Sequence, residues 1–180
     1  MRAAAAAVAL AFLLAGCGGD KTAGGADDLP GPVPEGTVYA EPPPKALAAP
    51  PFSAELVDGT PVRAVDLWRE RPLVLVFTAS WCERCADVHR EAASAVDERD
   101  GAVALLGIVP EDDRDRARDY ADELDLGYPV AVAAQRVWLN YAAREPPVVV
   151  LVARGGKVLR GWPGGVAVRT LSRRLAELFP

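Results

Sequence analysis

The residues best suited to chemistry are two cysteines three positions apart, Cys82 and Cys85. A continuous apolar run at residues 73–77 predicts a buried strand, and the residues from Cys82 onward have helical periodicity. The first thiol is therefore expected at a helix N-terminus, where free N–H groups and the helix dipole stabilise a thiolate. The second cysteine is near enough to form a disulfide with it. This arrangement predicts a reversible dithiol–disulfide switch that needs no other cofactor.

Two other interpretations of the motif compete with the redox switch. Half of a structural zinc site would need a second pair of Cys or His ligands, and the chain offers only Cys17 and His89. An inert structural disulfide is uncommon in so tight a loop at a helix start. The strand-then-helix context favours the redox interpretation, and no metal site is expected.

Three other residues bear on the chemistry of the cysteines. His89, the only histidine, follows Cys85 by four residues and is expected on the same helical face. It is a candidate proton shuttle with a pKa near neutrality, and the competing interpretation is a partly exposed surface histidine. Between the cysteines, Arg84 favours a thiolate and Glu83 opposes it, so their net effect does not follow from the sequence.

Composition and charge restrict the class of protein. The chain has 180 residues, 51% of them hydrophobic, which is enough for one globular domain with a sizeable core. Its net charge is −5 and it contains no basic run, so nucleic acid is not an expected partner.

The amino-terminal residues are typical of a bacterial lipoprotein signal. Arg2 precedes an apolar stretch at 3–14, which is too short to span a bilayer and matches the hydrophobic region of a secretory signal. The sequence Leu-Ala-Gly-Cys at 14–17 resembles a site at which a lipoprotein is cleaved and its cysteine acylated. We therefore expect residues 1–16 to be a signal peptide and Cys17 to carry a lipid. A plain signal peptide and an uncleaved anchor are the alternatives.

Two further regions follow the predicted signal. Residues 17–50 are rich in Gly, Ala and Pro without apolar periodicity, which predicts a disordered linker. In residues 51–180, strands alternate with helices, which predicts an α/β sheet covered on both faces. The expected strands lie at 52–56, 61–64, 73–78, 102–109, 129–132, 147–153 and 158–161, and the expected helices at 66–68, 82–98, 110–127, 134–143 and 167–179.

Several motifs in this order resemble the thioredoxin fold, in particular the TlpA/ResA type of membrane-tethered thiol–disulfide oxidoreductases of the redoxin superfamily. The resemblance covers residues 52–179, about 70% of the chain. It implies a central mixed sheet with helices on both faces, an N-terminal β-hairpin extension and one inserted helix. The motifs are Leu56-x-Asp58-Gly59, Val76-Phe77-x-x-x-Trp81-Cys82-x-x-Cys85, Gly107-Ile108-Val109-x-Glu111-Asp112, Tyr128-Pro129-Val130, Pro146-Pro147-Val148 and Gly155-Gly156-Lys157.

The resemblance also assigns roles to residues near the cysteines. It implies that the peptide bond between Pro146 and Pro147 is cis and that this pair lines a substrate groove, whereas two trans prolines are the alternative. It implies that Trp81 packs over the disulfide. Residues 162–165 are expected near the same edge, where they shape the groove or supply a core tryptophan.

One feature of the family is missing from this chain. Thioredoxin has a carboxylate in the central strand, and the ResA type has one shortly after the second cysteine. The corresponding residues here are Val76 and Val88. The residue that replaces the missing carboxylate is therefore not evident from the sequence.

The resemblance implies thiol–disulfide exchange with protein substrates on the extracytoplasmic side of the cell membrane, where Cys82 forms a mixed disulfide and Cys85 resolves it. A reductant role, as in cytochrome c maturation, is slightly favoured over an oxidising role in envelope protein folding. The expected partners are thiol- or disulfide-bearing proteins and an upstream membrane electron donor or acceptor. The protein itself is expected to be a monomer.

Three rival functions compete with thiol–disulfide exchange. A copper-handling protein of the Sco type would have Cys-x-x-x-Cys and a distant histidine, and this chain has neither. A peroxiredoxin-like peroxidase is disfavoured because Thr78 and Cys82 have the wrong spacing. A docking domain with an unreactive dithiol is the third alternative.

Overall fold

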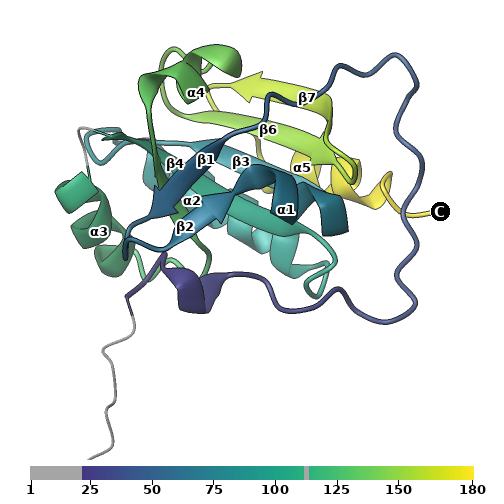
Figure 1. The fold of residues 1–180 in the computed structure, drawn as a ribbon, viewed down its shortest axis with the longest axis horizontal. Coiled ribbons are helices and arrows are strands. Elements are labelled where there is room, and N and C mark those ends of the chain that lie inside the picture. Colours follow the sequence, from purple (N-terminus) through teal and green to yellow (C-terminus); the bar gives the residue numbers. More distant parts are fainter. Residues whose placement is uncertain (1–21, 112–113) are drawn as a thin grey trace, which may run out of the picture.

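The computed structural model describes residues 22–111 and 114–180. The predicted signal peptide and Cys17 lie outside the described residues. Within them, seven strands form one mixed sheet in the order β2-β1-β5-β4-β3-β6-β7 (Figure 1). The strands are β1 (Ser53–Leu56), β2 (Pro61–Arg63), β3 (Leu73–Phe77), β4 (Ala104–Pro110), β5 (Val130–Ala133), β6 (Val148–Ala153) and β7 (Lys157–Pro163). The helices are α1 (Ala64–Glu70), α2 (Cys85–Asp97), α3 (Arg114–Glu123), α4 (Gln135–Asn140) and α5 (Val168–Ala176).

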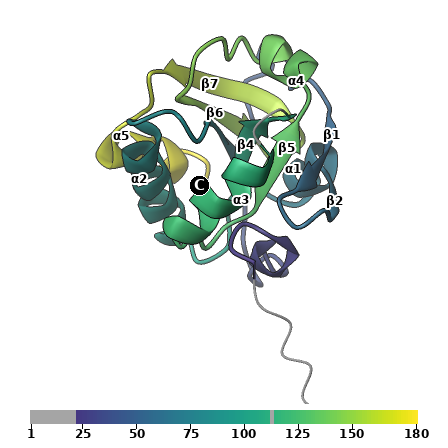
Figure 2. The same ribbon diagram turned by 90° about the vertical axis from the view of Figure 1, so that its left-hand side faces the viewer.

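The helices cover both faces of the sheet, as predicted. Figure 2 shows α2, α3 and α5 on one side of the sheet and α1 and α4 on the other. One core cluster joins residues of α2, α3 and α5 to the sheet, and a second joins residues of α1 and α4 to its other face. None of the described helices is long and apolar enough to cross a membrane.

Strand β3 lies at the centre of this arrangement. It pairs in parallel with β4 and antiparallel with β6, and all five of its residues are fully buried. Alternate side chains enter the two core clusters: Leu73, Leu75 and Phe77 face one, and Val74 and Val76 face the other. The continuous apolar run therefore reflects a strand that is buried on both faces.

Most predicted elements are present, with shifted ends. The main correction concerns α2, which begins at Cys85 rather than at Cys82, because residues 79–85 form two tight turns before the helix. Strand β4 extends to Pro110, and α3 is described from Arg114 onward. Where one helical turn was predicted at 66–68, α1 runs from Ala64 to Glu70.

The N-terminal segment, residues 22–50, differs from the predicted disordered linker. It contains one short 3-10 helix, η1 (Ala26–Asp28), and otherwise follows the surface of the domain without regular structure (Figure 1). Its backbone is nevertheless bonded to three separate elements. Val130 N–H donates to Gly24 O, Ala40 N–H donates to Leu178 O, and Val158 N–H donates to Leu47 O, each at 2.8 Å.

A buried arginine joins this segment to the domain. Arg71, which follows α1, is only 5% exposed, and its guanidinium donates to Gly31 O of the N-terminal segment and to Gly101 O of the turn before β4. Tyr39, in the same N-terminal segment as Gly31, makes a second link to the domain: its hydroxyl donates to Ala102 O at 2.8 Å. A buried cation is stable only when its N–H donors are paired, so the two carbonyl groups stabilise the guanidinium of Arg71 in its buried position.

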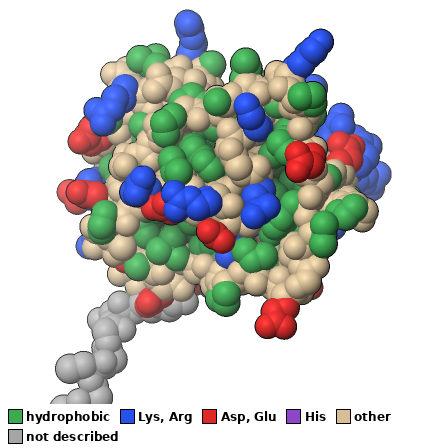
Figure 3. Space-filling view, turned by 45° about the vertical axis from the view of Figure 1, so that its right-hand side comes forward, with side chains coloured by type: hydrophobic (Ala, Val, Ile, Leu, Met, Phe, Trp, Pro, Cys, Tyr) green, Lys and Arg blue, Asp and Glu red, His purple; other side chains and the backbone are tan. Residues whose placement is uncertain are grey.

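The face of the molecule drawn in Figure 3 carries both signs of charge. Figure 3 shows Lys and Arg side chains interspersed with Asp and Glu and with apolar side chains. Neither sign forms a continuous patch on this face, so it presents no strong single-sign potential.

Replacement of Arg71 should destabilise the domain and loosen the N-terminal segment. We expect Arg71→Ala to lower the free energy of unfolding by about 2–3 kcal/mol, because hydrogen bonds from a charged group are lost and two carbonyl groups lose their donor. Chemical denaturation measures this loss, and limited proteolysis within residues 22–50 should accelerate. Arg69→Ala is the matched control, since Arg69 is exposed and makes only a surface ion pair with Asp66 at 3.4 Å. Equal stability of the two variants would contradict the assignment.

Candidate active site

The two cysteines lie at the end of β3 and are joined by a disulfide, with their Cα atoms 5.4 Å apart. Two successive turns lead from the strand into the helix: Cys82 N–H donates to Ala79 O and Cys85 N–H donates to Cys82 O, both at 3.0 Å. Cys82 therefore precedes α2, and Cys85 is its first residue. The helix dipole still points its positive end at this turn, which favours negative charge on a sulfur there.

The two cysteines differ in how far they can be reached. Cys82 is 9% exposed and lines a surface groove, whereas Cys85 is completely buried and does not line it. A partner protein can thus meet Cys82 but not Cys85. The two sulfurs are thus asymmetric, with only Cys82 open to the groove.

The groove beside Cys82 has a volume of about 710 Å³ and is formed by three connections. These are the turn between β3 and α2, the connection from α4 to β6, and the end of β7 (Figure 2). The lining residues are Trp81, Cys82, Glu83, Arg84, Ala142, Arg144, Glu145, Pro146, Pro147, Val148, Pro163 and Gly164.

The predicted cis bond between Pro146 and Pro147 is confirmed, and both prolines line the groove. Gly164 connects the three parts of the wall. Its N–H donates to Pro147 O at 2.8 Å, and its carbonyl accepts from Arg84 Nη2 at 3.1 Å. The turn that holds the cysteines is thus fastened to the proline pair through a single glycine.

The two tryptophans near the site are placed differently. Trp81 lines the groove next to Cys82 and is 63% exposed, so its ring is available to a partner. That this ring packs over the disulfide stays a prediction. Trp162 packs against the core, while Pro163 and Gly164 after it line the groove. The segment 162–165 therefore fulfils both roles that the sequence suggested.

His89 lies in the core, which corrects the prediction of a partly exposed histidine. It is 1% exposed, its Nε2 lies 3.1 Å from Thr78 Oγ1, and its Nδ1 is hydrogen-bonded to the hydroxyl of Tyr128. Burial lowers the pKa of His89 to about 4. The side chain is therefore neutral at physiological pH, and the predicted near-neutral pKa of a proton shuttle is also wrong.

The positions of the missing carboxylates are apolar in three dimensions as well. Val76 and Val88 both lie in the core cluster between α2, α5 and the sheet. A Cβ atom at Gly165 would come within 2.5 Å of a Val88 methyl group, so the loop after β7 packs tightly here and requires glycine. Val88 therefore packs directly against this loop.

Sequence reasoning missed the partners of His89, namely Thr78 and Tyr128. Thr78 follows β3 directly and continues the alternation of Val74 and Val76, so its hydroxyl faces α2. This alternation was a usable signal. Tyr128 gave no signal, because it comes from a loop 39 residues after His89 and meets it only through the tertiary fold.

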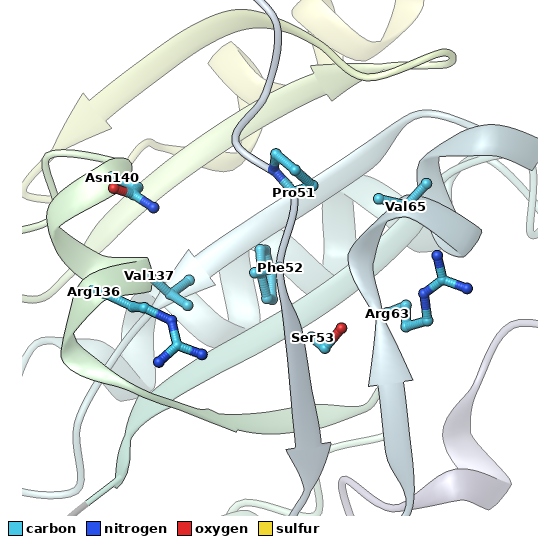
Figure 4. Close-up of a pocket in the computed structure, with 8 residues that line it drawn as sticks. All are labelled: Pro51, Phe52, Ser53, Arg63, Val65, Arg136, Val137 and Asn140. Atoms are coloured by element: carbon cyan, nitrogen blue, oxygen red, sulfur yellow. The ribbon is translucent and has the colours of Figure 1, made fainter.

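A second, smaller cavity of about 310 Å³ lies away from the disulfide, between β1, β2 and α4. Figure 4 shows Phe52 inside it, with Arg136 from α4 and Arg63 from β2 on either side. No cysteine lines this cavity, and Arg63 is already near Asp66 at 3.7 Å. The redox groups of the described residues therefore lie at the larger groove.

Comparison with known proteins agrees with the fold and the site. The chain belongs to the AhpC/TSA family, which matches residues 46–160. No curated protein matches the chain.

The solved structures that resemble it include thiol–disulfide oxidoreductases, and they confirm the thioredoxin-like fold. A secreted disulfide oxidoreductase of Mycobacterium tuberculosis is 23% identical, with 71% of this chain and 96% of that one covered and a TM-score of 0.61. A thiol–disulfide oxidoreductase of Bacteroides fragilis is 24% identical, with 73% and 98% covered and a TM-score of 0.62. An exposed lipoprotein thioredoxin of Streptococcus pneumoniae is 22% identical, with 72% and 100% covered and a TM-score of 0.64.

The buried histidine should make stability depend on pH. Because the pKa of His89 is about 4 in the folded state and 6.5 when exposed, the unfolded chain binds a proton that the folded chain does not between these values. Stability is complete above pH 6.5 and should fall by about 1.4 kcal/mol per unit as the pH drops towards 4. Denaturation of wild type and His89→Gln at pH 5–7 measures the effect. The variant should lack this part of the slope, and parallel slopes would refute the explanation.

Proposed function

We propose that this protein catalyses thiol–disulfide exchange with protein substrates through Cys82 and Cys85. The observation that carries the proposal is the disulfide at the end of β3, of which Cys82 alone lines the groove. The similar solved proteins described as disulfide oxidoreductases support the same class of reaction. The disulfide pair itself carries the electrons, and the reaction requires no further cofactor.

In the reductive direction, the thiolate of Cys82 attacks one sulfur of a partner disulfide. A mixed disulfide forms, the bond within the partner breaks, and the departing partner sulfur takes up a proton. Cys85 then loses its proton and attacks the Cys82 sulfur, which forms the Cys82–Cys85 disulfide and releases the second partner thiol. The enzyme dithiol is oxidised by two electrons and the partner disulfide is reduced by two. The oxidative direction is the reverse.

A location outside the cytoplasmic membrane, with a lipid on Cys17, is part of the proposal. The sequence at 14–17 supports it, as do similar proteins described as secreted or as an exposed lipoprotein. The path of the N-terminal segment is compatible with it. Gly24 bonds to Val130, the first residue of β5, whereas Cys82 follows the last residue of β3. Since β3, β4 and β5 are parallel, Gly24 and the groove lie at opposite ends of these strands.

We further propose a reductant role, with cytochrome c maturation as the favoured pathway and a membrane protein as electron source. The acting form is taken to be a monomer. The peroxidase alternative has no support from the site, because Thr78 is fully buried and its hydroxyl faces His89. The copper-binding alternative is disfavoured by the sequence, since the chain lacks the Cys-x-x-x-Cys spacing of the Sco type.

Loss of either cysteine should stop turnover in different ways. In an insulin reduction assay followed by turbidity, Cys82→Ser should be inactive because it cannot form the mixed disulfide. Cys85→Ser should form a mixed disulfide that accumulates without turnover and is detected by non-reducing electrophoresis. Ser80→Ala controls for substitution within the same turn. Catalysis by Cys82→Ser would sink the assignment.

The direction of electron flow is tested by the reduction potential of the Cys82–Cys85 pair. A reductant should equilibrate near the value of thioredoxin, about −270 mV, and a strong periplasmic oxidant near about −120 mV. Equilibration against glutathione or dithiothreitol buffers, followed by thiol trapping, measures the potential. A value near the oxidant would exclude the reductant role, and failure to equilibrate would indicate an unreactive docking domain.

A further inference from the structure

The start of β1 lies at a gap in the sheet. Successive residues of an antiparallel strand direct their main-chain groups alternately to the two neighbouring strands. Ala64 N–H donates to Phe52 O at 3.1 Å, so Phe52 bonds towards the β2 side, whereas Val57 N–H donates to Val130 O of β5 at 2.9 Å. Ser53 follows the same alternation as Val57. Its N–H and its carbonyl therefore point away from β2, to the side of β5.

Strand β5 ends before it reaches Ser53. The register pairs Glu55 with Val132, so the residue opposite Ser53 is Ala134. Strand β5 stops at Ala133, and Ala134 already leads into α4. No main-chain hydrogen bond joins Ser53 to Ala134 or to another described residue on this side. One main-chain donor and one main-chain acceptor are thus free at the gap.

The cavity of about 310 Å³ opens over this gap, and Ser53 is among its lining residues. Figure 4 shows Arg136 and Arg63 on two sides of Phe52, with Val137 facing the same space. None of the lining residues is acidic. The side chain of Arg136 forms no ion pair or hydrogen bond within the described residues. An unpaired guanidinium beside apolar side chains favours an anion that also carries an apolar group.

The groups at the gap match the end of a peptide chain. A terminal carboxylate accepts hydrogen bonds from a main-chain N–H and from a guanidinium at once, and the last amide N–H donates to a free carbonyl. A fatty acid has the carboxylate and the apolar group, but it has no N–H for the carbonyl. A longer strand would find no further donor, because Pro51, two residues before Ser53, has no N–H. The gap therefore suits one terminal residue.

We propose that this cavity is a second binding site, which takes the C-terminal residue of a partner polypeptide that ends in an apolar side chain and a free carboxylate. The guanidinium of Arg136 and the N–H of Ser53 bind the carboxylate, and Phe52 and Val137 contact the side chain. The site lies away from the disulfide, so a partner bound here leaves Cys82 accessible. The inference goes beyond the proposed function and does not depend on it.

The first test compares the free and the amidated end of one peptide. Binding of N-acetyl-Ala-Ala-Leu to the full chain, with its disulfide intact, is followed by titration in NMR spectra. We expect saturable binding, and amidation of the leucine or Arg136→Gln should each weaken it about 10-fold, because a charge-assisted hydrogen bond is lost. Arg169→Gln is the matched control, since it removes the same charge from an exposed position on α5 and should bind as the wild type does. Equal affinity for acid and amide, unchanged affinity of Arg136→Gln, or no saturable binding would overturn the inference.

The second test uses the wild-type chain and does not depend on the folding of a variant. N-methylation of the last amide of the peptide removes its N–H and should weaken binding several-fold. Hexanoate, an apolar carboxylate without an N–H, should also bind more weakly than the peptide. Hexanoate that bound as tightly as the peptide would assign the cavity to fatty acids and overturn the inference. These titrations involve no thiol exchange, so their outcome is separate from that of the insulin assay, which tests the proposed function.

Discussion

The complete burial of β3 is the constraint on which the site depends. A strand that is paired on both edges and packed on both faces cannot shift without disrupting both core clusters. The end of β3 is therefore fixed, and so are the positions of the residues that follow it. Thr78 is held by His89 through its side chain, and Ala79 O holds the amide of Cys82. The reactive sulfur is placed by rigid neighbours on both sides, which is the condition for an attack in a defined direction.

The surroundings of Cys85 are as apolar as those of β3. Val76 and Val88 occupy the positions where related proteins have carboxylates, and His89 nearby is kept neutral by burial. Among the described residues close to Cys85 in sequence, none on its buried face offers a charged base. Under the proposed function, deprotonation of Cys85 relies on the helix N-terminus and on the first partner sulfur, which departs as a thiolate and can accept the proton at the groove.

The sequence predicted well what is decided by neighbouring residues and poorly what is decided by distant ones. The strands were evident because parallel strands buried on both faces are continuous apolar runs, as in residues 73–77. The start of α2 was misplaced by three residues because turns before a helix have the same composition as its first turn. The spacing of His89 from Cys85 predicted the helical face on which His89 lies, but not how deeply its side chain is buried. The N-terminal segment looked disordered because its order comes from hydrogen bonds to distant residues, such as the side chain of Arg71 and the backbone of Val130, which composition does not report.

That same segment explains how the outer edge of the sheet is closed. Strand β7 is an edge strand, and an unpaired edge invites pairing with another chain. Near its start, Leu47 O accepts from Val158 N–H, and Ala48 forms a bridge with Lys157. Near its end, Pro163 has no N–H to offer, and Gly164 turns inward to bond Pro147. The edge of β7 is thus covered near its start by the N-terminal segment, and near its end it lacks the N–H donor that a residue other than Pro163 would provide. The groove beside Cys82 lies at this second end, where Pro163 and Gly164 both protect the end of the sheet edge and form part of the groove wall.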